Sequence, residues 1–477
     1  MSASLTGNTF AEEAENLDMQ CSWTFRAATL SPRGDYITDR NRESRRTLAK
    51  DKTLHVILPE EAAYFCVEWY ERPATALFSL LNKDGDTLRE VTAEDTYVTI
   101  LPLEAGTAEV VLKATEADII IAEAHVFSDG ELPEPYRVFL PLPEKLDYMV
   151  FAAHPDDDVL FLGAVVPYLG GEAGLAGTIV YMTKPVLHQR NTEALMGAWT
   201  MGLRYTPIFG SFKDVFANSF EKLSLYVNRD ELLTYVVRLL RQYKPELVFT
   251  HEPEGEYGHY EHRLLSDVVQ EAFRRAAQEG YDPESVEKYG VWQVKKLYLH
   301  DYEQSDTLLL FDPDAPLSSF GGKSAYEICC EAFTKHVSQQ KTSYAVHRYI
   351  EHENSFNAFG LAASVVGDFA DPLEGIDPPL LSNYVPPTPT PLPTPTPTPL
   401  PTDTPAPIPT AVPYFAPPTV VPAIETVPVS AAPDTPLPDE GELFTGALPP
   451  LYIALLCLLG AVALGGCIFF IKKWRTL

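Results

Sequence analysis

A chain of 477 residues is too long for one ordinary domain, so we expect two folded units with additional segments. The hydrophobic fraction of 45% is sufficient to build a core in each unit. The formal net charge of −30 argues against a nucleic-acid partner, because phosphates are bound by clustered Lys and Arg.

The first part of the chain predicts a β-rich domain. Residues 1–45 form a polar, acidic N-terminal segment without the apolar stretch of a signal peptide. Residues 46–143 predict an all-β sandwich, because short runs of alternating and β-branched residues are separated by turn signals such as Asp84-Gly85. Together with residues 37–39 and 123–130, these strands resemble a galactose-binding-like (discoidin) module, and the resemblance implies sugar binding. A structural sandwich packed on its neighbour is the alternative.

Residues 144–376 predict an α/β domain, which a Pro-rich run at residues 132–143 joins to the sandwich. Alternating strands and helices indicate a Rossmann-like, mostly parallel sheet with helices on both faces. No Gly-x-Gly-x-x-Gly pattern follows the first strand, so we predict no nucleotide. The expected strands are 148–153, 177–183, 205–209, 246–250 and 294–300, and the expected helices are 159–169, 191–203, 229–243, 260–278 and 324–340.

A first polar cluster stands where the opening strand of this domain ends. His154 and Pro155 are followed by three acids, Asp156, Asp157 and Asp158. Ligands of open α/β sheets bind beyond the carboxyl ends of the strands. Adjacent carboxylates repel one another unless a positive charge lies among them, and a divalent metal beside a neutral imidazole supplies one. The alternative is a helix start, with an early proline and acids near the positive end of the dipole.

A second polar cluster follows the strand predicted at residues 246–250. His259 and His262 are three residues apart at the start of a helix, so they share a face. Because both clusters follow strand ends, we expect them on the same rim. Two imidazoles and a carboxylate, with one position left for water, are typical of a catalytic zinc site. The alternative is that these histidines only cap a helix or lie in a solvated loop.

The two clusters together resemble the motifs of the PIG-L / LmbE-like deacetylase family. The resemblance rests on residues 153–158 and 255–262, with Arg190-Asn191-Thr192-Glu193-Ala194 and residues 335–340 as further matches, and it covers residues 146–376. The family includes N-acetylglucosaminyl-phosphatidylinositol de-N-acetylases and the deacetylases of mycothiol and bacillithiol synthesis. Its first motif usually closes with Glu, whereas this chain has Asp158, which puts a contact around the metal ligands in doubt.

The resemblance implies a role for each matching residue. It implies that His154, Asp157 and His262 bind Zn²⁺, or another divalent metal, and that Asp156 is the general base. His259 and Tyr257 are expected to stabilise the oxyanion formed from an acetamide carbonyl. Arg190 is expected to contact substrate, or else to pair with Glu193 one helical turn away. We predict that the remaining candidates are not ligands: His188, His251, His300 and His352.

The C-terminal part predicts a membrane anchor. Residues 377–446 predict a Pro/Thr-rich stalk, because Thr-Pro repeats dominate residues 385–438 and favour an extended chain. Residues 447–477 then predict a transmembrane helix, with 448–471 spanning the bilayer and a basic cytoplasmic tail after it. This topology makes the protein a single-pass protein of the cell membrane with an extracellular enzyme domain, as in a bacterial envelope, although no export signal is visible. A tail-anchored cytoplasmic enzyme is the alternative.

The expected function is therefore that of a membrane-anchored, zinc-dependent deacetylase. It would hydrolyse the N-acetyl amide of an N-acetylglucosamine-type sugar or glycoconjugate, and its partners would be that glycan and the membrane. Two alternatives stay open: a zinc amidase for another N-acyl substrate, and a non-catalytic surface protein that binds carbohydrate.

Overall fold

The computed structural model describes residues 13–26, 37–185, 187–341, 344–348, 355–369 and 371–377. All of them belong to the first of two compact units, Met1–Thr390, whereas the second unit, Pro391–Leu477, lies outside the described residues. The predicted membrane helix (448–471) and nearly all of the predicted stalk (377–446) therefore lie outside the described residues as well. Within the described residues, no helix combines the length and the apolar character needed to cross a membrane.

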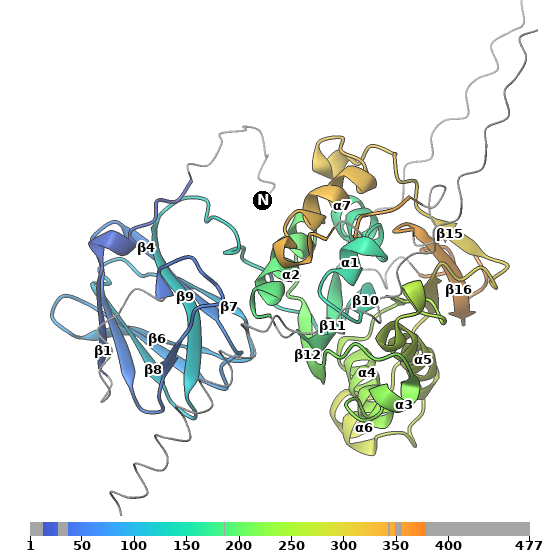
Figure 1. Cartoon of the computed structure of the whole chain (residues 1–477), viewed down its shortest axis with the longest axis horizontal. Helices are drawn as coiled ribbons and strands as arrows, with labels where there is room; N and C mark the ends of the chain where they lie inside the picture. The colour runs from blue at the N-terminus through green and yellow to red at the C-terminus, as the bar shows by residue number, and fades with distance from the viewer. Residues whose placement is uncertain are drawn as a thin grey trace, which may run out of the picture. The chain divides into compact units, whose positions relative to one another are not determined.

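The N-terminal β-rich region consists of two antiparallel sheets, as Figure 1 shows in blue. One sheet has five strands and the other has four, and core residues come from both sheets. This confirms the predicted β-rich character of the region. In sheet order the strands are β1 (Ser22–Arg26), β3 (Thr53–Ile57), β8 (Glu109–Ala114), β5 (Ala76–Leu81) and β6 (Thr87–Ala93), then β2 (Arg46–Leu48), β9 (Ile119–Ser128), β4 (Ala62–Trp69) and β7 (Val98–Pro102).

Residues 1–45 were predicted as a polar segment outside the sandwich. This prediction is wrong for Ser22–Arg26, which form strand β1 of the first sheet. Strand β1 pairs antiparallel with β3. Trp23 and Phe25 are two residues apart, so both rings lie on one face of the strand and pack against the core of the region. A short 3₁₀ turn, η1 (Asp18–Gln20), precedes the strand.

The α/β region is built on one seven-stranded sheet. Five strands are parallel neighbours, and the last two, β16 and β15, run antiparallel at one edge. This confirms the predicted mostly parallel sheet. In sheet order the strands are β12 (Ile208–Lys213), β11 (Gly177–Lys184), β10 (Tyr148–Ala152), β13 (Leu247–Thr250), β14 (Lys296–His300), β16 (Ala358–Ser364) and β15 (Leu308–Leu310).

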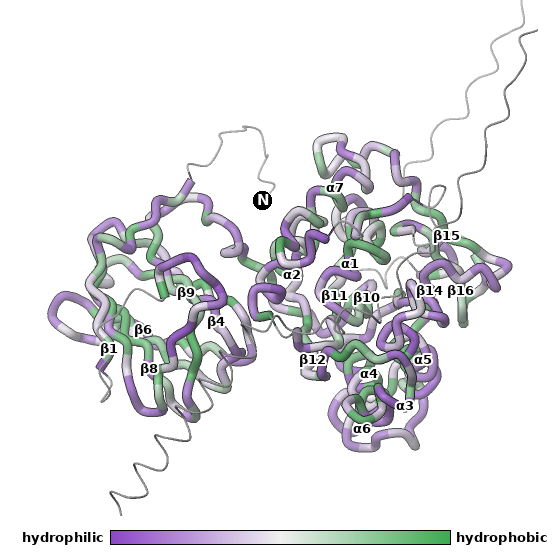
Figure 2. Tube along the Cα trace, in the orientation of Figure 1, coloured by the Kyte–Doolittle hydropathy of each residue, from purple (hydrophilic) through white to green (hydrophobic). Residues whose placement is uncertain are grey.

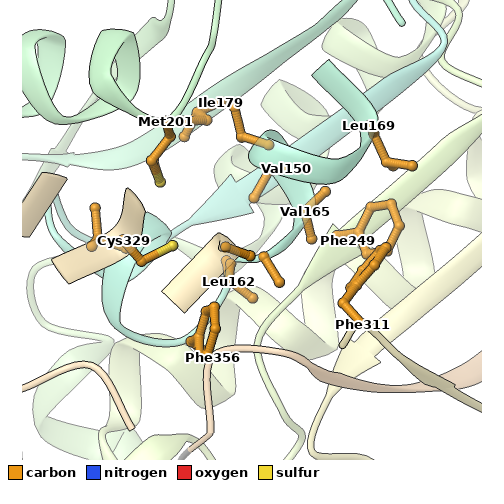
Figure 3. Close-up of a cluster of buried hydrophobic side chains, with 14 of the residues drawn as sticks. Val150, Leu162, Val165, Leu169, Ile179, Met201, Phe249, Phe311, Cys329 and Phe356 are labelled. Carbon is orange, nitrogen blue, oxygen red and sulfur yellow. The ribbon is translucent and has the colours of Figure 1, made fainter. Parts of the chain in front are cut away.

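Helices cover both faces of this sheet (Figure 1). Residues of β10 alternate between two hydrophobic cores, because successive side chains of a strand point to opposite faces: Val150 joins one core and Phe151 the other. Figure 3 shows the first core, where Val150 and Phe249 of the sheet lie among side chains such as Leu162 and Cys329. The helices are α1 (Asp157–Leu160), α2 (Gln189–Thr200) and α7 (Ala325–Phe333) on this side, and α3 (Phe220–Leu223), α4 (Arg229–Tyr243) and α5 (Tyr260–Arg275) on the other, with α6 (Pro283–Tyr289) packed against α4.

Most predicted helices of this region are present, and α4 has the predicted bounds. Its first turn is capped by the Asn228 side chain, which accepts hydrogen bonds from two backbone N–H groups, and it ends where Lys244 turns left-handed before Pro245. In Figure 2 the hydrophobic residues gather on the faces that meet in the interior, whereas outer loops are mostly hydrophilic. The spacing of the hydrophobic residues that form these faces can be read from the sequence, which is why the helices could be predicted.

The prediction of a single helix at residues 159–169 is wrong. The structure has the short helix α1, which ends at Leu160, and then a π-helical segment, η3 (Val166–Glu172). The break lies around Gly163, whose carbonyl accepts a hydrogen bond from Cys329 of α7. A Cβ atom at Gly163 would lie 2.4 Å from the Val159 carbonyl oxygen and 2.9 Å from that sulfur, so this position has room only for glycine.

Candidate active site

The site lies at the carboxyl ends of the parallel strands. His154 follows β10, Asp214 follows β12, His251 follows β13 and His300 ends β14. Because these strands are parallel, their carboxyl ends meet at one edge of the sheet. The topology therefore gathers four chemically active side chains that are far apart in the sequence.

Three buried donor atoms form a nearly equilateral triangle at this edge. His154 Nδ1 lies 3.2 Å from Asp157 Oδ2 and 3.2 Å from His262 Nε2, and the third side, from His262 Nε2 to Asp157 Oδ2, measures 3.3 Å. The His154 backbone N–H donates to Asp157 Oδ2 at 2.7 Å, which holds that carboxylate in place. The structure thus brings together the three residues predicted as metal ligands.

This triangle fits a zinc ion. Ligand atoms about 2.0–2.1 Å from a tetrahedral ion are separated by about 3.3–3.4 Å, close to the sides observed. Two imidazole nitrogens and a carboxylate oxygen at such distances repel one another unless a proton or a cation lies among them. The donor set, two imidazoles and one carboxylate, is also the usual set of a catalytic zinc site. His154, Asp157 and His262 are therefore the residues whose geometry fits the ion, and His259 and His251 also offer nitrogen atoms within 4.8 Å of two of them each.

His251 also approaches the triangle, but protein groups occupy both of its ring nitrogens. Its Nε2 accepts a hydrogen bond from the Ala153 backbone N–H at 3.0 Å, and its Nδ1 lies 2.7 Å from Glu256 Oε2. Its ring stacks on His262 with centroids 4.1 Å apart. His251 Nε2 also lies 3.4 Å from Asp157 Oδ2, and the three residues Asp157, His251 and His262 form a group that could hold a metal ion, so the expectation that His251 is not a ligand stays a prediction.

One buried carboxylate, Glu256, holds three histidines. Its Oε2 lies 2.7 Å from Nδ1 of both His251 and His262, and its Oε1 lies 2.6 Å from His300 Nδ1. Burial alone would raise the pKa of Glu256, but the imidazoles, above all His251, outweigh this effect and keep its pKa well below the ordinary value. Because a carboxylate only accepts hydrogen bonds, His262 must place its proton on Nδ1, which leaves the Nε2 lone pair facing the triangle.

The backbone around Glu256 is shaped to bury this side chain. Glu256 lies in the 3₁₀ turn η4 (Glu256–Gly258), between Gly255 with φ of 69° and Tyr257 with φ of 46°. A Cβ atom at Gly255 would lie 2.5 Å from the His259 carbonyl oxygen, so only glycine fits this close turn. No local pattern marks Glu256, because its three partners come from the end of strand β13, from helix α5 and from strand β14.

Asp156 lies beside the triangle without belonging to it. Its Oδ1 accepts a hydrogen bond from Arg190 at 2.8 Å, and its backbone has φ of 147°, a conformation that is strained for a residue with a side chain. Burial, with a contribution from the charge of Asp157, raises the pKa of Asp156 to about 6, although the Arg190 guanidinium opposes the shift. A strained, buried carboxylate beside a metal site is typical of a catalytic group.

Arg190 is predicted to contact substrate or to pair with Glu193. In the structure it pairs instead with Asp156 and, at 3.3 Å, with Asp214. Glu193 accepts hydrogen bonds from the backbone N–H and the hydroxyl of Ser338. The predicted pair of Arg190 with Glu193 is therefore wrong, because each of the two side chains bonds to residues that are distant in the sequence. Arg190 still lines the cavity, so contact with substrate stays a prediction.

Asp158, where the family usually has Glu, points away from the triangle. Its Oδ2 accepts a hydrogen bond from the Tyr181 hydroxyl at 2.8 Å. Burial raises the pKa of Asp158 to about 8. The shorter side chain thus makes a buried contact with strand β11, and the three donor atoms of the triangle do not depend on it.

A cavity of about 170 Å³ opens over the triangle. Its walls include two metal-ligand candidates, the Asp156 carboxylate and side chains from both helices and loops. The described residues that line it are His154, Asp156, Asp157, Leu160, Phe161, Arg190, Asp214, Phe216, Tyr257, His259, Gln339, Lys341 and Tyr344. The sequence did not predict three of these residues, Asp214, Phe216 and Lys341, because no local motif marks a residue that only the fold brings to a cavity.

His259 and Tyr257 both line this cavity but differ in exposure. The His259 ring lies with its centroid 4.9 Å from that of His154, and its Nδ1 has no hydrogen-bond partner among the described residues. Burial, with the neighbouring imidazoles, lowers the pKa of His259 to about 3, so the ring is neutral near pH 7. Tyr257 is 56% exposed and lies at the rim. Their expected contact with an oxyanion stays a prediction.

The other predicted non-ligands lie apart from the triangle. His300 lies behind Glu256, with its Nε2 on the Ser355 carbonyl oxygen. An imidazole between two acceptors carries a proton on each nitrogen. Burial alone would lower the pKa of His300, but Asp301 and Glu256 outweigh this effect and raise it. His188 does not line the cavity, and His352 lies outside the described residues.

Comparison with known proteins places this site inside a family match. The family model described as "PIG-L: GlcNAc-PI de-N-acetylase" matches residues 149–273. That segment contains every predicted site residue: His154, Asp156, Asp157, Arg190, Tyr257, His259 and His262. His300 and the segment around Gln339 lie after it.

Curated relatives carry the name 1D-myo-inositol 2-acetamido-2-deoxy-alpha-D-glucopyranoside deacetylase. A Frankia casuarinae relative is 24% identical over 186 residues, which are 33% of this chain and 58% of the relative. A relative from Salinispora arenicola is 25% identical over 30% of this chain and 56% of its own length. One from Segniliparus rotundus is 42% identical over 13% of this chain and 18% of its own length. The chain thus spans less than two thirds of each of these relatives.

Solved structures resemble each region weakly. The N,N'-diacetylchitobiose deacetylase from Pyrococcus horikoshii aligns with 41% of this chain and 71% of its own, at 17% identity and a TM-score of 0.32. A fucose binding module from Streptococcus pneumoniae aligns with 24% of this chain and 96% of its own, at 13% identity and a TM-score of 0.22.

Proposed function

Because residues 149–273 form a domain of the PIG-L family, we propose that this protein is a zinc-dependent deacetylase that hydrolyses the N-acetyl amide of an N-acetylglucosamine-type sugar or glycoconjugate. The names of the curated relatives support the substrate class. The observation that carries the proposal is the triangle of donor atoms with the Asp156 carboxylate beside it in one cavity.

His154, Asp157 and His262 would hold the metal. A bound zinc ion supplies Lewis-acid chemistry, because it polarises a carbonyl oxygen and lowers the pKa of a water molecule to about 7. The Nδ1–H of His262 bonds to Glu256, so its Nε2 is available as a ligand atom without a change of tautomer.

Asp156 has the position and the surroundings of the general base. Its carboxylate would take a proton from the attacking water and return it to the nitrogen of the departing amine as the C–N bond breaks. The products are acetate and a free amino sugar. The Arg190 guanidinium fixes Oδ1 at 2.8 Å and so keeps the carboxylate at the cavity wall.

His259 is placed to stabilise negative charge on the carbonyl oxygen. Its ring lines the cavity and is neutral near pH 7, so a ring N–H can donate to the substrate. Tyr257, at the rim, can donate a second hydrogen bond from its hydroxyl.

The test of this function is acetate release from N-acetylglucosamine and its oligomers. We expect release by the zinc-loaded protein, loss of release after treatment with a chelator, and recovery when zinc is added back, because the donor triangle needs a cation. Mass analysis of the amine product is the second readout. If folded, zinc-loaded protein released acetate from none of these sugars, the proposal would be wrong, and N-acyl amides of other acids would be assayed next.

We also propose that the protein is anchored in a cell membrane through residues 448–471, with the enzyme domain outside the cell. The support is in the sequence: an apolar stretch of spanning length, with Lys472, Lys473 and Arg475 after it. Protease added to intact cells should remove the enzyme domain and leave a cytoplasmic marker protein whole. Protection of the enzyme domain until the cells are lysed would contradict the external placement.

A further inference from the structure

Phe216 is a large apolar side chain that is exposed at the rim of the cavity. It is 86% exposed, yet it lines the cavity, and its ring centroid lies 5.8 Å from that of His259. It lies in the loop between strand β12 and helix α3. Exposed apolar groups at the mouth of a polar cavity often mark a surface that a ligand covers.

The loop around Phe216 is anchored on both sides. Val215 packs against the hydrophobic core beneath α4 and α5, and Ala217 is buried in it. The Val215 backbone N–H donates to Glu261 Oε1 at 3.2 Å, while Glu261 Oε2 lies 2.7 Å from His154 Nε2. The backbone on both sides of Phe216 is therefore held at a defined place relative to a metal-ligand candidate.

The cavity is too small to enclose a long substrate. At about 170 Å³ it is below the roughly 300–1,000 Å³ of sites that enclose a drug-sized ligand. A cavity of this size takes only the reacting end of such a substrate, its acetamido group. The remainder of a larger substrate must leave the cavity across its rim, where Phe216 lies.

We propose that Phe216 determines substrate specificity by stacking on the sugar ring attached to the reacting N-acetylglucosamine, so that the preferred substrates are glycans of two or more rings. This inference rests on the proposed deacetylase function. A pyranose ring has an apolar face of C–H groups, and covering the phenyl ring with that face removes apolar surface from water.

The polar groups beside Phe216 favour a sugar over a purely apolar group. Asp214, Arg190, Gln339 and Lys341 line the same cavity and can bond to hydroxyl groups. An alkyl chain lying on Phe216 would cover such groups without offering them hydrogen bonds, which costs free energy. A sugar ring presents a C–H face to Phe216 and hydroxyl groups at its edge.

The test compares kcat/KM for N-acetylglucosamine and for N,N'-diacetylchitobiose. We expect Phe216→Ala to lower kcat/KM for the disaccharide by about tenfold and to change the monosaccharide value by less than about twofold, because the second ring of the disaccharide adds most of the apolar area that covers Phe216. Phe216→Trp should retain the preference, since it keeps an aromatic face. Leu225→Ala is the matched control: Leu225 is 74% exposed and does not line the cavity, so both values should stay unchanged.

A binding measurement separates this inference from the proposed function. Calorimetric titration of the zinc-loaded Asp156→Asn protein with the disaccharide should show weaker binding when Phe216→Ala is added. If the wild type were active but Phe216→Ala lowered both kcat/KM values equally, the inference would be wrong and the deacetylase function would stand. If Phe216→Ala lowered kcat/KM for octyl N-acetylglucosaminide more than for the disaccharide, the group that lies on Phe216 would be an alkyl chain and not a sugar. Wild-type protein that released acetate from neither sugar would overturn the proposed function itself.

Discussion

Replacing Asp156 by asparagine is expected to lower kcat for acetate release by about 10²–10⁴-fold while zinc remains bound. The amide cannot take the proton of the attacking water, but it keeps the size of the side chain and a hydrogen-bond acceptor for Arg190. None of the three sides of the donor triangle involves Asp156, so the metal content should not change. Single-turnover acetate release, with zinc content measured on the same sample, tests both parts.

Asp158 provides the matched control for this substitution. It is also buried and belongs to the same run of three aspartates, but its Oδ2 accepts from Tyr181, and it does not line the cavity. Because burial raises its pKa to about 8, the side chain is mostly protonated near pH 7, and Asp158→Asn changes little charge there. We expect kcat within a few-fold of wild type. Loss of zinc in Asp156→Asn, or equal losses of kcat in the two variants, would contradict the assignment of Asp156 as the base.

Replacing Glu256 by glutamine or alanine is expected to weaken zinc binding by about 10–100-fold. The carboxylate receives three imidazole N–H groups, and an amide offers only one acceptor oxygen. With glutamine, the NH₂ group must face at least one N–H donor. If the NH₂ group takes the Oε2 position, or if the side chain is alanine, the Nδ1–H of His262 loses its partner and the Nε2 lone pair is no longer held toward the triangle; if the NH₂ group takes the Oε1 position, His300 loses its partner instead, so alanine should have the larger effect. Competition with a chromophoric chelator measures the zinc affinity.

The same substitution should destabilise the protein without metal. Glu256 and the three histidines are buried, and removing one member of a buried charged network costs about 3–5 kcal/mol. Urea unfolding of the metal-free protein measures this loss. Glu254→Gln is the control, because Glu254 lies in the same loop but forms an exposed pair with Arg263, of the kind that contributes about 0–1 kcal/mol. Equal effects of the two substitutions would show that Glu256 does not position His262.

The sequence predicted those site residues that lie close to one another along the chain. His154 and Asp157 are three residues apart, and so are His259 and His262, and such spacing places side chains on one face of a turn or helix. The partner of Arg190 could not be found in this way. Glu193, one turn away, was the natural local choice, but Asp156 and Asp214 reach the guanidinium across the fold.

The fold could be predicted where hydrophobic periodicity is strong. Helix α4 carries apolar residues at helical spacing between a capping Asn228 and Lys244-Pro245, and its bounds were predicted correctly. The apolar run at residues 159–169 was predicted as one helix, but α1 ends at Leu160, and the chain passes Gly163, in contact with Cys329 of α7, before the π-helical segment begins at Val166. Periodicity reports which residues prefer burial and not how closely a neighbouring helix approaches.

By itself, the sequence determined the alternation of strands and helices, the two histidine clusters and the family motifs, because these depend on local spacing and residue type. Only the tertiary structure decided that Glu256 bridges three histidines, that Asp214 pairs with Arg190 and that Phe216 lies at the cavity rim. The physical reason is the parallel sheet: it brings the ends of strands far apart in sequence to one edge, and no local pattern records which side chains meet there.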